Sequence, residues 1–443
     1  MTLSFRRNDC ASMASMASIA SMASMASLSR LAFVVALLHV LWLARDVRSD
    51  WPSILGPTRN GMADASCNLP DSFSGLPKQI WKVEAGQGYA GPAIAGNNVV
   101  LFDRVKDFDR VRMLDASTGK EIWRRDLNAK YRDGVDPDKG PRSVPSIQEK
   151  SVLVYSAAGD LTLLSRKDGD ILWERSLRTE YEGDDGYFGA GSTPLVVDNR
   201  VIVNAGGKSA CIVCVGLNDG KTLWTASKGD ASYASPILLG ATAPPAETKA
   251  VVVVPARLAT LGLDLETGKE LWKVPFGQRG TTVNAATPIV TSQGNIFLTA
   301  SYGIGSLTIR PSQSSAEIVR KAFEISSQYA SPVAMDGKIF GSDGREDQGG
   351  GIYKCIREDD GNLVWKQLEM PISHTIGVGQ KLLICGIDGQ LWCLRSSATQ
   401  FEPLWKTNLP RGVFRAIPAL SDNRLFVRTS SGNGDAWYCF ELR

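Results

Sequence analysis

Short apolar segments alternate with turn residues along most of the chain. These segments are rich in Val, Ile, Leu and Phe, and clusters of Gly, Asn, Asp and Pro separate them. The pattern predicts short β-strands joined by tight turns. The segments that show it best are Asn98–Phe102, Ser151–Tyr155, Arg200–Asn204, Ala250–Val254 and Arg424–Thr429.

Tryptophan recurs in these segments at intervals of 40 to 51 residues. In five units a Gly stands four residues before the Trp, and the best preserved are Asp115–Trp123 and Asp264–Trp272. Three further positions, Trp81, Phe323 and Trp405, fit the spacing without that Gly. Such self-similarity indicates a repeat in which each unit is one small sheet. The five pairs are Gly119 with Trp123, Gly169 with Trp173, Gly220 with Trp224, Gly268 with Trp272, and Gly361 with Trp365.

A second short motif follows each Trp of the repeat and usually contains a Pro at the start of an apolar segment. In one unit His374 stands where the others have Pro. We expect the Pro to open the innermost strand, the Gly to adopt a left-handed conformation in a hairpin, and the Trp to fill the space between sheets. The seven motifs that contain the Pro are Gly91–Ile94, Val144–Ile147, Thr193–Val196, Ser235–Leu238, Thr287–Val290, Ser331–Ala334 and Ile417–Leu420.

These units predict an all-β fold, an eight-bladed β-propeller with four-stranded antiparallel blades; seven blades is the alternative. The first Trp unit, Gln79–Val83, has no three strands before it, and the last, Ala436–Leu442, ends before a fourth strand. An N-terminal strand is therefore expected to complete the last blade. The weakest unit is Leu307–Phe323, which lacks the Gly turn. The predicted division is a leader over 1–49, a lead-in over 50–78 and the propeller over 79–443.

Charge argues against a nucleic-acid partner. The chain has 49 Lys and Arg against 46 Asp and Glu, and five basic and two acidic residues of these lie in residues 1–49. Residues 50–443 therefore contain 44 basic and 44 acidic residues and are neutral overall. They lack the positive field that binding of a polyanion requires. The body also contains a single His, His374, which disfavours a multi-histidine metal centre; we expect no metal site.

The N-terminus has the features of an export signal. Residues 11–27 are a low-complexity tract, and the apolar segment Leu31–Ala44 follows. That segment is short for a bilayer span and suits the core of a signal peptide, with small residues at Val47–Ser49 for cleavage before Asp50. An uncleaved membrane anchor is the alternative. We therefore expect an extracytoplasmic protein, in the periplasm or cell envelope or secreted, that meets a membrane only through this segment if it is retained.

Seven cysteines remain after Cys10, an odd number that cannot all pair internally. Cys211 and Cys214 form a C-x-x-C sequence, but within an apolar strand, where residues three apart point to opposite faces. We interpret them as small buried hydrophobic residues; a redox or zinc pair is the alternative.

The Gly-Lys-x-x-Trp units resemble the tryptophan-docking repeats of quinoprotein-type (PQQ-repeat) β-propellers, a family with pyrroloquinoline-quinone (PQQ) dehydrogenases and the non-catalytic outer-membrane assembly propeller BamB. The segment Trp51–Gly61 is similar to the W-P-x-x-x-G-P-x-R-x-G lead-in of exported PQQ-repeat proteins of planctomycete type. The resemblance covers residues 50–443 and implies the fold more than an activity, because the motif is a packing device.

The resemblance leaves two functions open. The dehydrogenases of this family use a disulfide between adjacent cysteines, a calcium ion and an Asp base. This chain has no adjacent cysteines and little room for long insertions, so no catalytic position is carried over and neither PQQ nor Ca²⁺ is expected. The favoured prediction is a non-catalytic propeller that binds a protein or a small ligand. The alternatives are a PQQ-dependent oxidoreductase and an enzyme with a loop-built site.

The candidate binding residues lie on one predicted face, formed by the loops between blades. Tyr89, Tyr233 and Tyr329 each stand three residues before a repeat Pro, and we expect them to ring a channel mouth, as ligand contacts or as packing between blades. Further candidates are Tyr131 and Tyr187 in long loops and His374, either a lone base or a channel-lining residue. The spacing of Asp133, Asp136 and Asp138 offers oxygens to Ca²⁺ but matches no established loop pattern, so solvated turns are the simpler interpretation.

Overall fold

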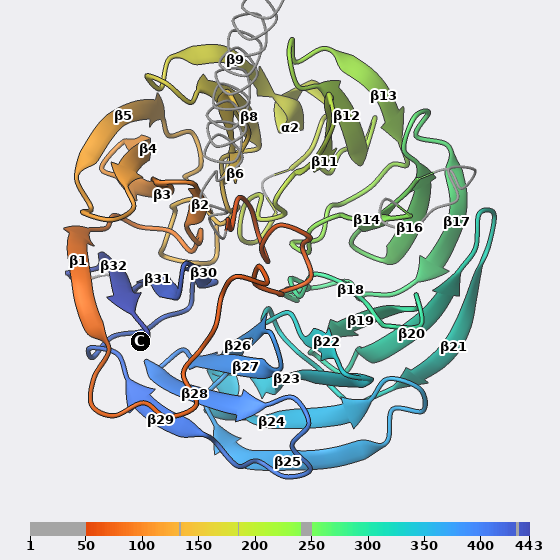
Figure 1. Cartoon of the computed structure of the whole chain (residues 1–443). Coiled ribbons are helices and arrows are strands. Elements are labelled where there is room, and N and C mark those ends of the chain that lie inside the picture. Colours follow the sequence, from red (N-terminus) through yellow and green to blue (C-terminus); the bar gives the residue numbers. More distant parts are fainter. Residues whose placement is uncertain (1–49, 133, 185, 241–249, 431–433) are drawn as a thin grey trace, which may run out of the picture. The chain divides into compact units, whose positions relative to one another are not determined.

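Eight four-stranded antiparallel sheets form a ring in the computed structural model (Figure 1). The structure describes residues 50–443 except 133, 185, 241–249 and 431–433, so the predictions for the leader lie outside the described residues. Eight blades, rather than seven, are confirmed. Within the described part of the chain no helix is long and apolar enough to cross a membrane.

Each blade runs outward from a short inner strand. Blades 1 and 2 contain β2 (Ala93–Ala95), β3 (Asn98–Val105), β4 (Phe108–Asp115), β5 (Glu121–Asn128), and β6 (Ser146–Ile147), β7 (Ser151–Tyr155), β8 (Asp160–Ser165), β9 (Ile171–Ser176). Blades 3 and 4 contain β10 (Leu195–Val197), β11 (Arg200–Asn204), β12 (Ile212–Gly216), β13 (Thr222–Ala226), and β14 (Ile237–Leu239), β15 (Val251–Pro255), β16 (Ala259–Asp264), β17 (Glu270–Pro275).

The second half of the ring repeats this order. Blades 5 and 6 contain β18 (Ile289–Val290), β19 (Ile296–Ala300), β20 (Gly305–Pro311), β21 (Ala316–Ala322), and β22 (Val333–Met335), β23 (Lys338–Arg345), β24 (Gly350–Arg357), β25 (Leu363–Met370). Blades 7 and 8 contain β26 (Ser373–Val378), β27 (Lys381–Gly386), β28 (Gln390–Arg395), β29 (Trp405–Asn408), and β30 (Ala419–Ser421), β31 (Arg424–Arg428), β32 (Ala436–Glu441), β1 (Lys78–Glu84). Two short helices, α2 (Leu177–Glu180) and η1 (Glu346–Gln348), lie in loops.

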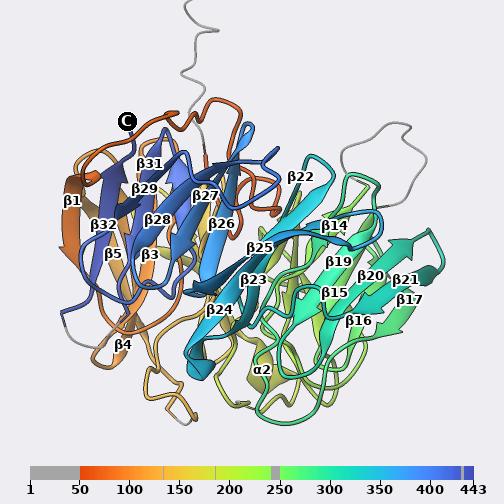
Figure 2. The ribbon, with the colours of Figure 1, turned by 90° about the horizontal axis from the view of Figure 1, so that it is seen from below.

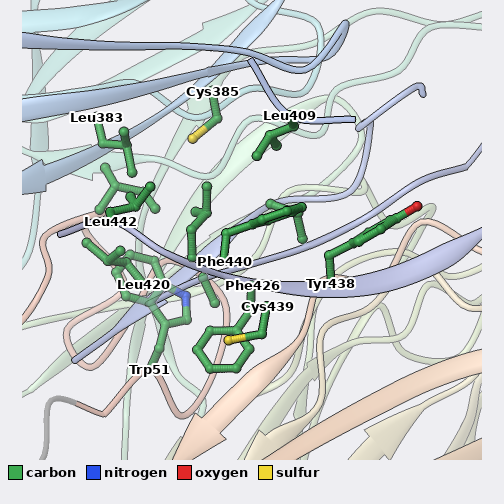
Figure 3. Close-up of a cluster of buried hydrophobic side chains, with 14 of the residues drawn as sticks. Trp51, Leu383, Cys385, Leu409, Leu420, Phe426, Tyr438, Cys439, Phe440 and Leu442 are labelled. Atoms are coloured by element: carbon green, nitrogen blue, oxygen red, sulfur yellow. The ribbon is translucent and has the colours of Figure 1, made fainter. Parts of the chain in front are cut away.

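The ring closes as the sequence predicts. Strand β1 pairs antiparallel with β32, so the first strand of the propeller completes the last blade. Strand pairing between the two ends of a chain gives both of them a ladder of hydrogen bonds that neither would have alone. The cluster in Figure 3 shows the apolar side of this closure, where Trp51, Leu383, Phe426 and Phe440 pack together with fully or almost fully buried side chains.

The tryptophans and glycines of the repeat form one contact between consecutive blades. The indole of Trp224 is 8% exposed, and its Nε1–H donates to the Leu265 carbonyl in the next blade at 3.0 Å. Gly268 lies against that indole at φ +69°, and a Cβ added there would be 2.4 Å from indole carbon Cε3. The Gly is therefore required twice, for its left-handed backbone and for the close approach of the ring. The same contact recurs at Gly119 with Trp81, Gly169 with Trp123 and Gly220 with Trp173.

Blade 5 departs from the prediction, because Phe323 does not occupy a docking position. Its side chain is 64% exposed just after β21, and Arg320 instead faces Gly361 of the next blade. The hairpin after β20 explains the error. Ile309 pairs with Ile318, nine positions on, whereas the equivalent pair in blade 4 is separated by seven, so the longer hairpin shifts the docking register. The prediction for Phe323 was wrong.

The residue before each repeat Pro links the inner strands into a belt. The backbone N–H of Thr193 donates to the Ser235 hydroxyl at 2.9 Å, and that of Thr287 donates to the Ser331 hydroxyl at 2.9 Å. Equivalent bonds run from Val144 to Thr193 and from Ser235 to Thr287. Each hydroxyl therefore satisfies a buried N–H of the preceding blade, from blade 2 to blade 6.

The lead-in closes one end of the central channel. Trp51 bridges to Ile94 of β2, Met62 bridges to Gly377 of β26, and the segment between them crosses the centre of the ring (Figure 1). The guanidinium of Arg59 is buried there, and it donates to the carbonyls of Pro236 at 2.7 Å and Pro194. Burial lowers the pKa of Arg59 to about 9. A buried cation is thus held by backbone dipoles of blades 3 and 4.

In blade 8 the third and fourth strands, β32 and β1, are not joined by a hairpin, because they come from opposite ends of the propeller. The later part of the lead-in occupies the place of that hairpin. The Trp405 indole N–H donates to the Pro70 carbonyl at 2.9 Å, and Phe73 packs against the same indole at 5.2 Å between ring centroids. Thr407 also donates to the Gly75 carbonyl at 2.6 Å. The lead-in thus lies on the face of the first-to-second and third-to-fourth strand hairpins, here called the turn face. The opposite surface, the loop face, carries the loops between blades (Figure 2).

Candidate functional site

The loop face contains the long connections that the sequence singled out. The connections after β5 and after β9 are the longest between blades, and the second contains α2. They touch through the backbone, because the Val135 N–H donates to the Tyr187 carbonyl at 2.9 Å. Figure 2 shows these loops on the side of the disc away from the lead-in. The two longest connections therefore form one joined surface on the loop face.

One repeat position forms a ring around the channel mouth. It is the position three residues before the Pro, and the residues there are Tyr89, Arg142, Gly191, Tyr233, Ala285, Tyr329 and Arg415. Direct contacts show that neighbours in this ring meet: the guanidinium of Arg142 lies 5.5 Å from the centre of the Tyr89 ring, and that of Arg415 lies 5.0 Å from it. Tyr89 is thus held between two arginines that occupy the same repeat position in the neighbouring units.

An ion pair joins two sides of this ring. Arg415 donates to the Glu346 carboxylate of η1 through two of its three guanidinium nitrogens, Nε at 2.7 Å and Nη2 at 2.5 Å. The Tyr329 hydroxyl donates to Glu346 at 2.8 Å, and Arg415 Nη1 donates to the Tyr89 hydroxyl at 2.9 Å. Tyr89 in turn donates to Asp136 of the first long loop at 3.2 Å. A bidentate guanidinium–carboxylate pair is geometrically specific, so this network fixes the loops of blades 1, 6 and 8 relative to one another.

Burial keeps the tyrosines of the network protonated. The pKa of Tyr89 is raised to about 12, mainly because its phenolate would be desolvated and also because Asp136 is near. The pKa of Tyr329 is raised further, by burial and by the Glu346 carboxylate. The pKa of the Arg415 guanidinium is also raised, since the Glu346 pair outweighs its desolvation. At neutral pH both tyrosines are therefore neutral hydrogen-bond donors, and Arg415 remains positively charged.

His374 is buried next to Tyr329 and the backbone of Arg415. It is 4% exposed, its Nε2 donates to the Arg415 carbonyl at 3.0 Å, and its ring lies 5.9 Å from that of Tyr329. Burial lowers its pKa to about 4, so the ring is neutral at physiological pH. Its Nδ1 has no hydrogen-bond partner among the described residues. His374 therefore supports the backbone that positions Arg415.

A cavity of about 650 Å³ opens where the ring residue is Gly191. A Cβ at Gly191 would lie 3.1 Å from Tyr233 and 3.6 Å from Arg142, so the loop backbone packs closely against both side chains at this edge of the cavity. Tyr187 and Tyr233 line the cavity, and Phe188 contacts the Tyr233 ring at 5.8 Å. The rest of the lining is mostly glycine backbone, with charged side chains of both signs: Arg178, Glu182, Asp184, Lys208, Asp230 and Arg257.

The remaining candidates have structural roles. Tyr131 is 1% exposed, and its carbonyl accepts from Arg104 at 2.6 Å, so it packs under the loop. Asp136 accepts from the Asp138 N–H of its own loop at 2.8 Å, and Asp138 accepts at 2.7 Å from the Gly88 N–H in the connection between β1 and β2. Asp133 lies outside the described residues. Both Cys211 and Cys214 are buried, and burial raises the pKa of each to about 12, as expected of inert thiols.

Sequence reasoning missed three members of the network, Arg142, Arg415 and Glu346. The two arginines were detectable, because they occupy the same position relative to the repeat Pro as the three tyrosines. Glu346 had no such signal, since it reaches Arg415 from 69 residues away.

The residues present do not fit a calcium-bound quinone. The resemblance implies adjacent cysteines, a calcium ion on acidic and amide side chains, and an Asp base, yet no two cysteines are adjacent in the sequence. Among the described residues no group of three His, Cys, Asp or Glu side chains is arranged to hold a metal ion.

The eight radial sheets, with their Gly–Trp contacts between blades, define a β-propeller of the PQQ-repeat class. The first strand of this propeller pairs with the last one and closes the ring. Comparison with known families gives the same result. The family described as outer membrane protein assembly factor BamB matches residues 77–139, 107–354 and 348–437, and the chain belongs to this family.

Individual relatives are distant. The chain is 23% identical over 369 residues to outer membrane protein assembly factor BamB of Yersinia pestis, which covers 71% of this chain and 88% of that one. The crystal structure of BamB from Moraxella catarrhalis superposes with a TM-score of 0.60 at 15% identity, covering 83% of this chain and 98% of the other. A quinohemoprotein alcohol dehydrogenase from Comamonas testosteroni gives 0.61 at 14% identity, with coverages of 89% and 80%. At these identities the two structures support the fold alone.

Proposed function

We propose that this protein is an extracytoplasmic, non-catalytic binding module that holds a segment of another protein on its loop face. The observation that carries the proposal is the cavity at Gly191, which joins half-exposed aromatic side chains to exposed glycine backbone. Tyr187 is 38% exposed and the nearby Val135 is 65% exposed, so both offer apolar area to a partner. Aromatic anchors surrounded by polar groups are typical of protein-binding surfaces.

Two further features support this function over catalysis. Burial raises the pKa of Tyr89 to about 12, and the Glu346 pair raises the pKa of Arg415 despite its desolvation, so the pKa values of both groups lie far from neutrality. The relatives are named as assembly factors for outer membrane proteins, a name that describes work on other proteins. The apolar segment Leu31–Ala44 supports export, either as a signal peptide or as an anchor.

Site-specific photocrosslinking tests the proposal. A benzophenone amino acid at Tyr187 is expected to crosslink a discrete protein in extracts of the native cell envelope. The matched control is the same amino acid at Leu223, which is 51% exposed on the outer strand β13, away from the cavity. Equal crosslinking at both positions, or none at Tyr187, would contradict the assignment of the loop face.

The enzyme alternative has its own assay. The purified protein is mixed with PQQ and Ca²⁺, and bound-cofactor absorbance and dye reduction with alcohols and sugars are recorded. We expect neither. Cofactor-dependent turnover would show that the protein is an oxidoreductase and would overturn the proposal.

A further inference from the structure

A second cavity, of about 640 Å³, lies on the loop face. Its walls come from the connection between blades 4 and 5 and from loops of blades 5 and 6. The lining consists of Gln278, Arg279, Gly280, Thr281, Thr282, Tyr302, Gly303, Arg345 and Gln348. These side chains supply amide, hydroxyl and guanidinium donors, whereas the first cavity also presents carboxylates.

The charge of this lining is positive. Arg279 and Arg345 are its only ionisable side chains apart from the Tyr302 phenol, and no carboxylate among the described residues lines it. Arg345 already pairs with Asp347, which lies outside the lining, with Nε to Oδ1 at 3.0 Å. Arg279 is exposed and makes no ion pair with any described residue, so its charge is available to a ligand. A guanidinium presents paired donors that match a carboxylate.

Tyr302 is held in this cavity in an unfavourable backbone conformation. Its φ is +65°, in the left-handed region that non-glycine residues rarely adopt. Two contacts hold it: the Arg345 guanidinium lies 4.0 Å from the ring centre, and the amide of Gln328, itself 8% exposed, donates to the Tyr302 hydroxyl at 2.8 Å. Strained residues that are held by their surroundings are common at binding sites.

The two cavities share a wall. Arg257 lines the first cavity, and its guanidinium donates to the Thr282 carbonyl at 2.8 Å and to the Gly280 carbonyl. Thr282 and Gly280 in turn line the second cavity. The two cavities therefore lie side by side on the loop face.

We propose that the second cavity recognises carboxylate side chains of the partner, so that the loop face selects segments in which acidic residues lie close to an apolar or aromatic anchor. This inference rests on the proposed function and specifies its ligand. Arg279 would contact the carboxylate directly. Arg345, fixed by Asp347 and Tyr302, would present its remaining donors from the opposite wall.

Fluorescence anisotropy with defined peptides tests the inference. The probe is a fluorescein-labelled peptide of sequence Tyr-Gly-Ser-Asp-Glu-Asp-Ser, and its comparison is the isostere Tyr-Gly-Ser-Asn-Gln-Asn-Ser. We expect the acidic probe to bind more tightly, and more weakly as salt is added, because exposed charges are screened. Arg279→Gln is expected to weaken its binding about three- to tenfold, the loss of one charge-assisted contact.

The control variant is Arg310→Gln, which removes an arginine of blade 5 that pairs with Glu317 far from this cavity. Equal affinity for the two peptides, or equal effects of the two variants, would overturn the inference, as would competition by inorganic phosphate as strong as by the unlabelled acidic peptide. Crosslinking at Tyr187 distinguishes the two proposals: if it persists while the peptides do not discriminate, the second cavity fails alone.

Discussion

Removing one docking indole should destabilise the propeller by an amount set by its burial. Trp224 is 8% exposed and donates one hydrogen bond to the next blade. Truncation of a large buried aromatic side chain costs about 3–5 kcal/mol. We therefore expect Trp224→Ala to lower the free energy of unfolding by that amount, measured by urea denaturation and circular dichroism.

The partner glycine makes the prediction more specific. An Ala at Gly268 would be strained by about 1–2 kcal/mol in the left-handed conformation, and its Cβ would also displace the indole. Once Trp224 has become Ala, the second cost disappears. The double variant should therefore be more stable than the sum of the single changes predicts, by about 1–3 kcal/mol.

The blade that lacks this contact supplies the control. Phe323 fits the Trp spacing of the repeat, but its side chain is 64% exposed. Phe323→Ala should therefore change the free energy of unfolding by no more than about 0.5 kcal/mol. Additive effects of Trp224→Ala and Gly268→Ala would refute the idea that the two residues form one contact. A loss at Phe323 as large as at Trp224 would refute the assignment of the docking register.

Two further variants test the belt and the buried histidine. Ser235→Ala leaves the Thr193 N–H without an acceptor and should cost about 1–3 kcal/mol, while Ser235→Thr restores the hydroxyl; retention of full stability by the alanine variant would disprove the belt. His374 has a pKa near 4 when folded against 6.5 when unfolded, so the unfolded state binds the proton first and stability falls between these values as the pH is lowered. The expected loss is about 2 kcal/mol from pH 7 to pH 5, and His374→Gln should lack it in urea titrations at both values; an unchanged pH dependence would contradict the neutral state.

The sequence predicted those parts of the fold that depend on local patterns. The Gly–Trp contact needs only a tight hairpin and a ring on the preceding blade, so residues such as Gly268 and Trp224 could be recognised directly. Phe323 could not be placed correctly, because its register depends on a hairpin length that the Trp spacing does not encode. The closure of the channel by Arg59 was also missed, since its acceptors lie 135 and 177 residues away.

The candidate site was predictable only where it follows the repeat. The tyrosines of the ring were found through the Pro that follows each of them, and Arg142 and Arg415 could have been found in the same way. Glu346 and Tyr302 could not, because one acts across two blades and the other is defined by backbone strain.

These observations suggest how a symmetrical scaffold acquires a binding site. The side chains that obey the repeat, such as Tyr89 and Arg415, bind one another and fill the mouth of the channel. The cavities lie outside this network: Gly191 lines the first, and the second is lined by the connection at Gln278–Thr282 and by loops of blades 5 and 6. The specificity of this propeller should therefore reside in the residues around these two openings and not in the motif that defines its family.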